Sequence, residues 1–115
     1  MVDPYVPDAG DLVWLDFDPQ AGREQAGFRP AVILSPRYFN LRTSLAYACP
    51  ISSKLKGYQF QIALPPGLPV HGVVLCEHMR SLDWKVRKTR YLGRMPDNVL
   101  AQVRGVVRTI AGISK

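Results

Sequence analysis

Two short stretches of the chain combine residue types that could bind and cleave a phosphodiester. The first holds a carboxylate and a guanidinium five residues apart, and the second holds two hydroxyls and two lysines: Glu24 and Arg29, then Ser52, Ser53, Lys54 and Lys56. Cations can hold a phosphate, a hydroxyl can donate a hydrogen bond to it, and a carboxylate can accept a proton. Two ordinary alternatives remain open. Glu24 and Arg29 could form a surface ion pair, and the hydroxyls could satisfy the backbone of a turn.

Other kinds of chemistry find little support in the sequence. His71 and His78 are seven residues apart, and no HxxxH or CxxC spacing accompanies them, so we expect no metal site. No Gly-rich run follows a predicted strand and opens a helix, and no GxSxG motif is present. We therefore expect no cofactor, and only chemistry that side chains can perform alone.

Strands dominate the first three-quarters of the predicted fold. Hydrophobic patterning and turn residues predict strands at residues 11–17, 31–35, 44–51, 58–64, 72–76 and 88–93. The second of these is continuously apolar, which is typical of a strand buried on both faces. Residues 19–28 contain two glycines and no periodicity, so they predict a long loop, and long loops in small domains often carry function.

A helix is predicted to begin at Pro96, which precedes an acidic residue at the positive end of the helix dipole. Apolar residues then recur at helical spacing, at Val99, Leu100, Val103, Val106, Val107 and Ile110. A chain of 115 residues fits one domain over residues 1–115. The expected fold class is α+β, mainly β: a small, bent or barrel-like antiparallel sheet with a C-terminal amphipathic helix packed on it.

Charge is distributed unevenly along the chain. Five acidic residues precede the first base, and from Arg23 onward fifteen bases face four acids, a net charge of +11 in that part. The densest basic stretch holds Arg80, Lys85, Arg87, Lys88, Arg90 and Arg94. Such a field attracts polyanions, either nucleic acid or an acidic protein segment. A solvated face kept for solubility is the alternative.

The cysteines and the ends of the chain bear on its location. Cys49 and Cys76 lie inside apolar runs, so we expect buried free thiols. The N-terminus lacks the pattern of a signal peptide, and no apolar run approaches the roughly 20 residues of a membrane helix. These features favour a cytoplasmic protein that does not engage a membrane.

Two longer motifs are GDLVWLDFDP at residues 10–19 and EQAGFRPAVILS at residues 24–35, and shorter ones are CPIS at 49–52, KGY at 56–58, GVVL at 72–75 and RSLDW at 80–84. With these motifs the chain resembles the MazF/PemK/Kid toxins of bacterial type II toxin–antitoxin pairs, and the MazF branch most closely over the first sixty residues. The likeness covers essentially the whole chain. Two differences from the Kid branch stand out, since Leu75 and Glu77 occupy the positions of its arginine and aspartate.

This resemblance implies an SH3-like β-barrel and a homodimer. It also implies a metal-independent endoribonuclease that cuts single-stranded RNA, chiefly mRNA, at short sequences by attack of the ribose 2′-hydroxyl, so that translation and growth stop. Its expected partner is an antitoxin with an acidic, flexible tail. The implied catalytic residues are Arg29, Ser52 and Glu24. The implied RNA contacts are Phe17, Gln25, Ser53, Lys54, Lys56, Glu77, His78 and Arg87.

Two other functions remain open at this point. A non-enzymatic toxin of the same fold could bind a protein target such as DNA gyrase, as the CcdB toxins do through a C-terminal tryptophan motif. This chain ends in AGISK and lacks that motif. A barrel that binds RNA without cleaving it is the second alternative.

Overall fold

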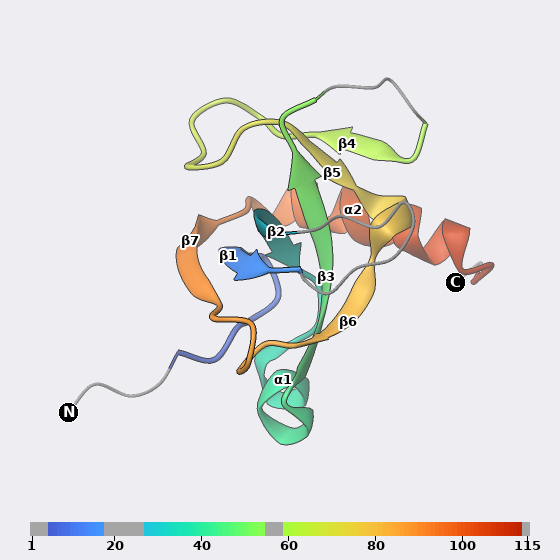
Figure 1. Ribbon diagram of the computed structural model, residues 1–115. Helices are drawn as coiled ribbons and strands as arrows, with labels where there is room; N and C mark the ends of the chain where they lie inside the picture. Colours follow the sequence, from blue (N-terminus) through green and yellow to red (C-terminus); the bar gives the residue numbers. More distant parts are fainter. Residues whose placement is uncertain (1–4, 18–26, 55–58, 114–115) are drawn as a thin grey trace.

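The computed structural model describes residues 5–17, 27–54 and 59–113, which form strands, two α-helices and a short 3-10 helix (Figure 1). In chain order the elements are β1 (Asp11–Asp16), β2 (Phe28–Ile33), α1 (Arg37–Thr43), β3 (Leu45–Ser52), β4 (Gln61–Ala63), β5 (Val73–Leu75), η1 (Cys76–His78), β6 (Arg80–Asp83), β7 (Arg90–Arg94) and α2 (Asp97–Ile110).

The strands form one bent sheet with the order β4-β5-β3-β2-β1-β7, and β6 pairs with β3 beside this path. Every strand pair among the described residues is antiparallel. Strand β3 is the centre of the sheet, because its first half pairs with β6, its middle with β2 and its end with β5. The predicted fold class is confirmed, although the strands of the described residues do not close into a complete barrel.

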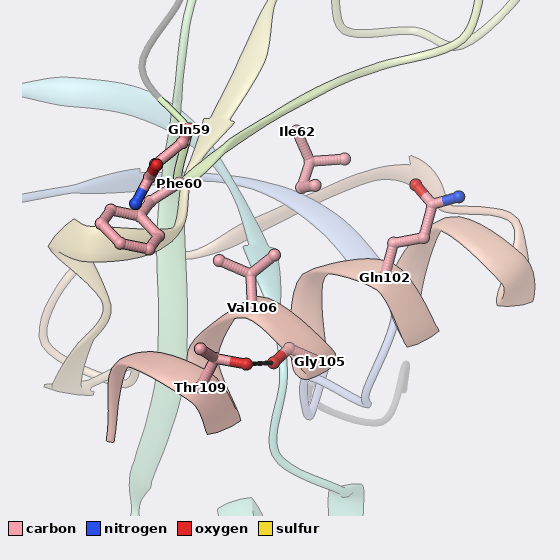
Figure 2. Close-up of a pocket in the computed structure, with 7 residues that line it drawn as sticks. All are labelled: Gln59, Phe60, Ile62, Gln102, Gly105, Val106 and Thr109. Carbon is pink, nitrogen blue, oxygen red and sulfur yellow. Dashed lines mark hydrogen bonds between the residues drawn. The ribbon is translucent and has the colours of Figure 1, made fainter. Parts of the chain in front are cut away.

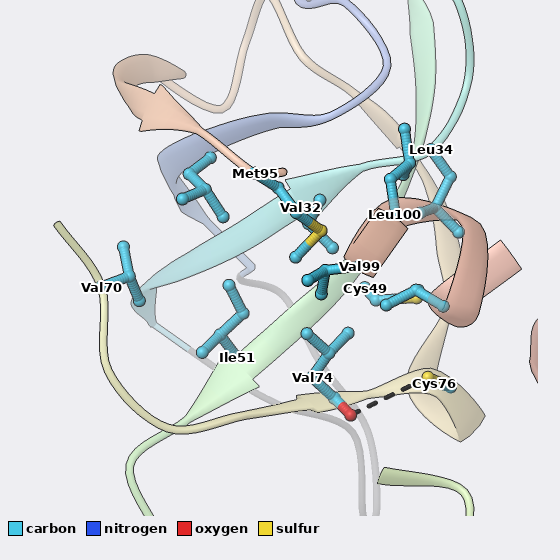
Figure 3. Close-up of a cluster of buried hydrophobic side chains, with 12 residues drawn as sticks. Val32, Leu34, Cys49, Ile51, Val70, Val74, Cys76, Met95, Val99 and Leu100 are labelled. Carbon is cyan, nitrogen blue, oxygen red and sulfur yellow. Dashed lines mark hydrogen bonds between the residues drawn. The ribbon is translucent and has the colours of Figure 1, made fainter. Parts of the chain in front are cut away.

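The two faces of the β1–β2 ribbon contribute to two different hydrophobic cores. Leu12 and Val32 point into a core that α2 covers with Val99, Leu100 and Val103 (Figure 3). Their neighbours along the strands point the other way, into a second core that includes Leu15, Phe17, Leu82 and Trp84. Burial on both faces explains why the sequence of β2 is continuously apolar after Pro30.

Both cysteines are free and buried in the core under α2, as predicted. Burial raises the pKa of the Cys76 thiol to about 12 and also raises the pKa of the Cys49 thiol above its usual range.

Helix α2 follows the predicted pattern. It begins directly after Pro96, and Val99, Leu100 and Val103 are buried. Its apolar stripe extends past the core, since Ile110 is 44% exposed. Neither helix in the described part of the chain is long and apolar enough to cross a membrane.

The predicted strands differ from the observed ones at their ends, and two of them differ by three residues at their start. Strand β2 begins at Phe28, three residues earlier than predicted, because Phe28, Arg29 and Pro30 pair with the end of β1. Strand β4 spans only Gln61–Ala63, and the two residues before it form a turn. Residues 18–26, most of the predicted long loop, and residue 58 of the predicted fourth strand lie outside the described residues.

Helix α1 and strand β6 were not predicted from the sequence. Helix α1 has no apolar face to reveal it, since the one buried residue in it is Asn40. The Asn40 side-chain amide donates hydrogen bonds to the carbonyl oxygens of Pro7 at 2.8 Å and Ser35 at 3.0 Å. The main-chain carbonyl oxygen of Asn40 accepts a hydrogen bond from the Trp84 indole nitrogen at 2.9 Å. One buried polar residue thus joins α1 to the N-terminal segment and to the turn after β6.

Part of the acidic N-terminal segment serves the fold itself. The buried Asp11 carboxylate accepts hydrogen bonds from the Tyr5 hydroxyl, from the Asp8 amide at 2.9 Å and from the Arg94 guanidinium at 3.2 Å. Burial, with the hydrogen bond to Asp11, raises the pKa of Tyr5 above its usual range. Asp11 and Arg94 therefore compensate each other's charge where β1 and β7 pair.

Candidate functional site

Arg29 and Ser52 lie on either side of the point where β2 and β3 separate. The last pair between these strands is Ala31 with Pro50, after which β3 turns to pair with β5. Because side chains alternate along a strand, Arg29 shares a face with Ala31, and Ser52 shares it with Pro50. Continuing the register by two residues sets Arg29 opposite Ser52. The guanidinium and the hydroxyl thus belong to one face of the sheet at its divergence.

The Ser52 side chain is held at the end of β3. It is 8% exposed, and its oxygen accepts a hydrogen bond from the Lys54 amide at 3.1 Å. The hydroxyl proton can therefore be donated to another acceptor. Gly72 packs against the main chain of Ser52, and its own carbonyl accepts a hydrogen bond from the Leu64 amide at 2.9 Å. These contacts fix the hydroxyl before any ligand arrives.

Three arginines surround the end of the β1–β2 ribbon. Arg29 in β2 pairs with Leu15. The Arg80 guanidinium lies 5.8 Å from the centre of the Phe17 ring and donates to the Phe17 carbonyl at 3.4 Å. The Arg87 guanidinium donates to the Asp16 carbonyl at 3.2 Å, and the Asp16 amide donates back to the Arg87 carbonyl at 3.0 Å. Three arginines against Asp16 give the described residues at this end of the ribbon a net positive charge.

The predicted RNA contacts fall into several places. Phe17 is fully buried in the second core and lies under Arg80, so its ring could stack on a base only after Arg80 moves. Ser53 and Lys54 are exposed just after β3. Glu77 is exposed and His78 half-buried in η1, which follows the far end of β5 from Ser52. Glu24, Gln25 and Lys56 lie outside the described residues.

Arg80 is the site residue to which the sequence alone assigned no role. It belongs to the densest basic stretch, but that stretch gave no reason to prefer it. In the structure Arg80 pairs with Ala48, whose side chain lies in the second core, and this register directs Arg80 to the face that carries Arg29 and Ser52. Arg80 precedes the buried Leu82 by two residues, and this strand spacing, which puts both side chains on one face, is the sequence signal that would have revealed it.

A separate hollow between β4 and α2 has a different character. Its volume is about 380 Å³. The residues that line it, shown in Figure 2, are Gln59, Phe60, Ile62, Gln102, Gly105, Val106 and Thr109. The Thr109 hydroxyl donates to the Gly105 carbonyl at 3.0 Å, within α2 (Figure 2). No side chain that lines this hollow titrates near neutral pH. Its lining can pack against an apolar surface, but it offers no acid, base or cation for catalysis.

Among the described residues, no three of the types His, Cys, Asp and Glu gather in a way that could hold a metal ion. What the candidate site offers is a fixed hydroxyl and permanently charged guanidiniums. The fold and the site together define a small, mainly β protein whose cationic sheet face suits a phosphate-bearing ligand.

Comparisons with known proteins agree with this description. Residues 8–111 match the family model described as PemK-like, MazF-like toxin of type II toxin–antitoxin system. The chain is 39% identical over 112 residues to "Endoribonuclease toxin MazF" of Escherichia coli K12, which covers 97% of this chain and all of that protein. It is 34% identical to "Endoribonuclease PemK" of Escherichia coli, over 88% of this chain and 79% of that protein.

Solved structures of similar proteins also match this chain. MazF from Deinococcus radiodurans superposes with a TM-score of 0.92 at 54% identity, over 95% of this chain and 99% of that one. The MazE–MazF complex from the same organism superposes with a TM-score of 0.86 at 49% identity, over 96% of this chain and all of that one. This chain therefore belongs to the family of PemK-like, MazF-like toxins of type II toxin–antitoxin systems, and the resemblance read from its motifs is confirmed.

Proposed function

We propose that this toxin is a sequence-specific endoribonuclease that cleaves single-stranded RNA, chiefly mRNA, without a metal ion. One observation carries the proposal: Arg29 and Ser52 share a sheet face at the point where β2 and β3 separate. The curated relatives are named as endoribonucleases, and their names support the reaction class.

In the proposed reaction the ribose 2′-oxygen attacks phosphorus and the bond from phosphorus to the 5′-oxygen breaks. The products are a 2′,3′-cyclic phosphate and a 5′-hydroxyl. One proton leaves the 2′-hydroxyl and one reaches the departing 5′-oxygen, so no water or oxidant is consumed. The enzyme must therefore supply a proton acceptor, a proton donor and a cation for the charge that develops on the phosphoryl oxygens.

Arg29 supplies the cation in this mechanism. Its guanidinium stays protonated and presents a planar fork that can hold two phosphate oxygens at once. Ser52 donates its hydroxyl proton to a nonbridging oxygen, and a preorganised donor of this kind contributes about 10²–10³ in rate. Because the Lys54 amide already holds the serine oxygen, little ordering is needed during the reaction.

Glu24 is the proposed base for the 2′-hydroxyl, and general acid–base help contributes about 10²–10⁴ in rate. If Glu24 orients Arg29 or reads a base edge instead, the arginine itself relays the proton. Replacing Glu24 by Gln separates the two roles, since the amide keeps hydrogen bonds but cannot accept the proton.

The regulation of the toxin follows from the same charges. We propose that an antitoxin with an acidic, flexible tail lies across the sheet face that carries Arg29 and Ser52 and competes with RNA for its cations. We also propose a homodimer as the working form, because two basic faces related by a two-fold axis make a groove long enough for several nucleotides. The Deinococcus MazE–MazF complexes support an antitoxin partner.

The decisive experiment is to incubate the purified chain with single-stranded RNA in the presence of a chelator and to map the new ends. Cyclic phosphate and 5′-hydroxyl ends at a short recurring sequence support the proposal. Intact RNA that stays bound would instead indicate an RNA-binding protein without turnover. Intact and unbound RNA, together with inhibition of DNA gyrase, would indicate a toxin with a protein target.

A further inference from the structure

A second concave surface lies on the other face of the β1–β2 ribbon. It has a volume of about 460 Å³ and is lined by two aromatic and two basic side chains, namely Trp14, Phe28, Lys88 and Arg90. The Trp14 and Phe28 rings lie nearly parallel, with centres 6.2 Å apart and 16° between their planes. We call these four residues the aromatic platform.

The register of the sheet builds the platform. Trp14 pairs with Arg90 on one side and with Pro30 on the other, so these side chains share a face. Phe28 pairs with Asp16, two residues along β1 from Trp14, and therefore reaches the same face diagonally.

The turn before β7 brings Lys88 to this face. The Asp16 amide donates to the Arg87 carbonyl at 3.0 Å, which fixes the residue before Lys88 against the end of β1. Lys88 itself has a left-handed backbone with φ of 54°. A residue held in that conformation costs stability, and such strain persists where neighbouring structure enforces it.

The exposure and charge of the platform indicate a ligand. Phe28 is 43% exposed, and it belongs to neither of the two hydrophobic cores. Lys88 and Arg90 are exposed, and neither forms a salt bridge with another described residue. Although Asp16 shares this face of β1, an aromatic surface beside two cations is the combination on which single-stranded nucleic acid binds, since bases stack on the rings and phosphates pair with the cations.

We propose that the aromatic platform binds unpaired nucleotides that flank the cleavage site of the RNA substrate. This inference rests on the proposed function and extends it. Phe28 and Arg29 are neighbours in β2 but point to opposite faces of the ribbon. Phe28 of the platform therefore adjoins Arg29 along β2 while lying on the opposite face, so we assign to the platform the flanking bases and not the scissile phosphate.

The platform also predicts how these nucleotides are read. The side chains that line it offer ring faces and positive charge, and a stacked ring accepts any base. Flanking nucleotides therefore increase affinity with little regard to their sequence, while the short cleavage sequence is read elsewhere.

The protein carries its own probe for this interaction. It has two tryptophans. Trp84 is buried, and its indole nitrogen donates a hydrogen bond to the main-chain carbonyl of Asn40, whereas Trp14 belongs to the platform. A stacked base quenches the fluorescence of Trp14 and leaves that of Trp84 unchanged. The ligands are 2′-O-methyl oligouridines of 4 and 12 nucleotides, which lack the nucleophile and stay intact. Binding is measured separately by the anisotropy of a label on the oligonucleotide.

We expect the 12-mer to quench tryptophan emission of the parent protein and not of Trp14→Phe. We expect Phe28→Ala to weaken 12-mer binding about tenfold, since one stacked base contributes about 1–3 kcal/mol. Lys88→Asn removes the charge with a residue that tolerates a left-handed backbone, so it should weaken binding without unfolding the turn. Arg42→Gln, an exposed substitution in α1, is the matched control and should bind as the parent does.

Unchanged emission when anisotropy shows the 12-mer to be bound would overturn the proposal. So would parental 12-mer affinity in both Phe28→Ala and Lys88→Asn. Quenching by an acidic peptide but not by the 12-mer would assign the platform to a protein partner and overturn it equally. RNA cleavage is measured in a separate assay. Cleavage without quenching would contradict only the proposal for the platform, and quenching without cleavage would contradict only the proposed endoribonuclease activity.

Discussion

Gly72 packs against Ser52 so closely that a Cβ atom on residue 72 would stand 2.0 Å from the Ser52 carbonyl oxygen. Its φ of +124° is also one that other residues rarely adopt. Since β3 and β5 meet here, the missing side chain is what allows Ser52 to be held in place.

We therefore expect Gly72→Ala to destabilise the protein and to displace the hydroxyl. Backbone strain alone costs about 1–3 kcal/mol, and the clash adds to it. Gly67→Ala is the matched control, because Gly67 has φ of +91° but no atom lies within 4 Å of the place that its Cβ would take. Urea unfolding of both variants measures the difference. Equal midpoints would show that the contact with Ser52 is unimportant.

Arg29→Ala should abolish cleavage while the fold remains. Arg29→Lys should lower cleavage about 10²-fold, because a point charge cannot reproduce the two parallel hydrogen bonds, and hydrogen bonds to charged groups contribute about 1.5–3 kcal/mol. Circular dichroism checks the fold, end-mapped RNA cleavage measures the rate, and Arg42→Gln is the control. A folded Arg29→Ala protein that cleaves at the parental rate would remove Arg29 from the mechanism.

Ser52→Ala should lower turnover about 10²–10³-fold and affect RNA binding much less, because the hydroxyl stabilises charge that develops only during the reaction. Ser52→Thr keeps the hydroxyl and should be tolerated. Ser81→Ala, which removes an exposed hydroxyl in β6, is the matched control. Single-turnover cleavage at saturating RNA separates turnover from binding. If Ser52→Ala reacts as fast as the parent, the role passes to Ser53.

Neutralising a true phosphate contact should make RNA binding less dependent on salt. For Lys54→Ala and Arg87→Ala we expect the slope of log affinity against log salt to fall by about 0.7 for each phosphate that is no longer neutralised. Lys54 is the cleaner test, since it is exposed, whereas Arg87 also holds the end of β1 through the Asp16 carbonyl. Slopes that match the parent would assign both residues to the solvated surface.

The buried thiols should resist alkylation in the folded protein at pH 8 and react once it unfolds. Burial raises the pKa of Cys76 to about 12, so the unfolded state releases this proton at lower pH than the folded state does. The stabilisation from a protonated thiol is complete below the pKa of an unfolded cysteine, about 8.5, and is lost as the pH rises towards 12. Mass spectrometry after iodoacetamide treatment measures the reactivity. Rapid modification of the native protein would contradict this burial.

The elements that could be predicted from the sequence are those whose own residues show a hydrophobic pattern. The apolar run of β2 and the helical spacing of α2 reflect burial against the two cores, so hydropathy alone reveals them. Helix α1 escaped because a hydrogen-bonded Asn40, and not an apolar face, anchors it. Strand β6 escaped because its four residues are defined by pairing with β3, more than thirty residues earlier in the chain.

The candidate site shows the same division. Motif resemblance named Arg29 and Ser52, but their shared face depends on the register of β2 with β3 and on the turn of β3 towards β5 after Pro50. No local pattern encodes that divergence. The position of Arg80 over Phe17 depends in turn on the unpredicted β6. Long-range pairing, and not residue type, decides which of the cations meet.

The central place of β3 has a consequence for amide hydrogen exchange. Three strands hold β3 along its length, and Ser52 lies at its end. An element so widely paired opens only when the whole domain opens, so its amides should be among the last to exchange. The proposed catalytic hydroxyl is thus part of the most persistent unit of the protein. Local opening of β3 alone is therefore not expected to inactivate the proposed site, and we expect inactivation by a molecule that occupies the surface around Ser52.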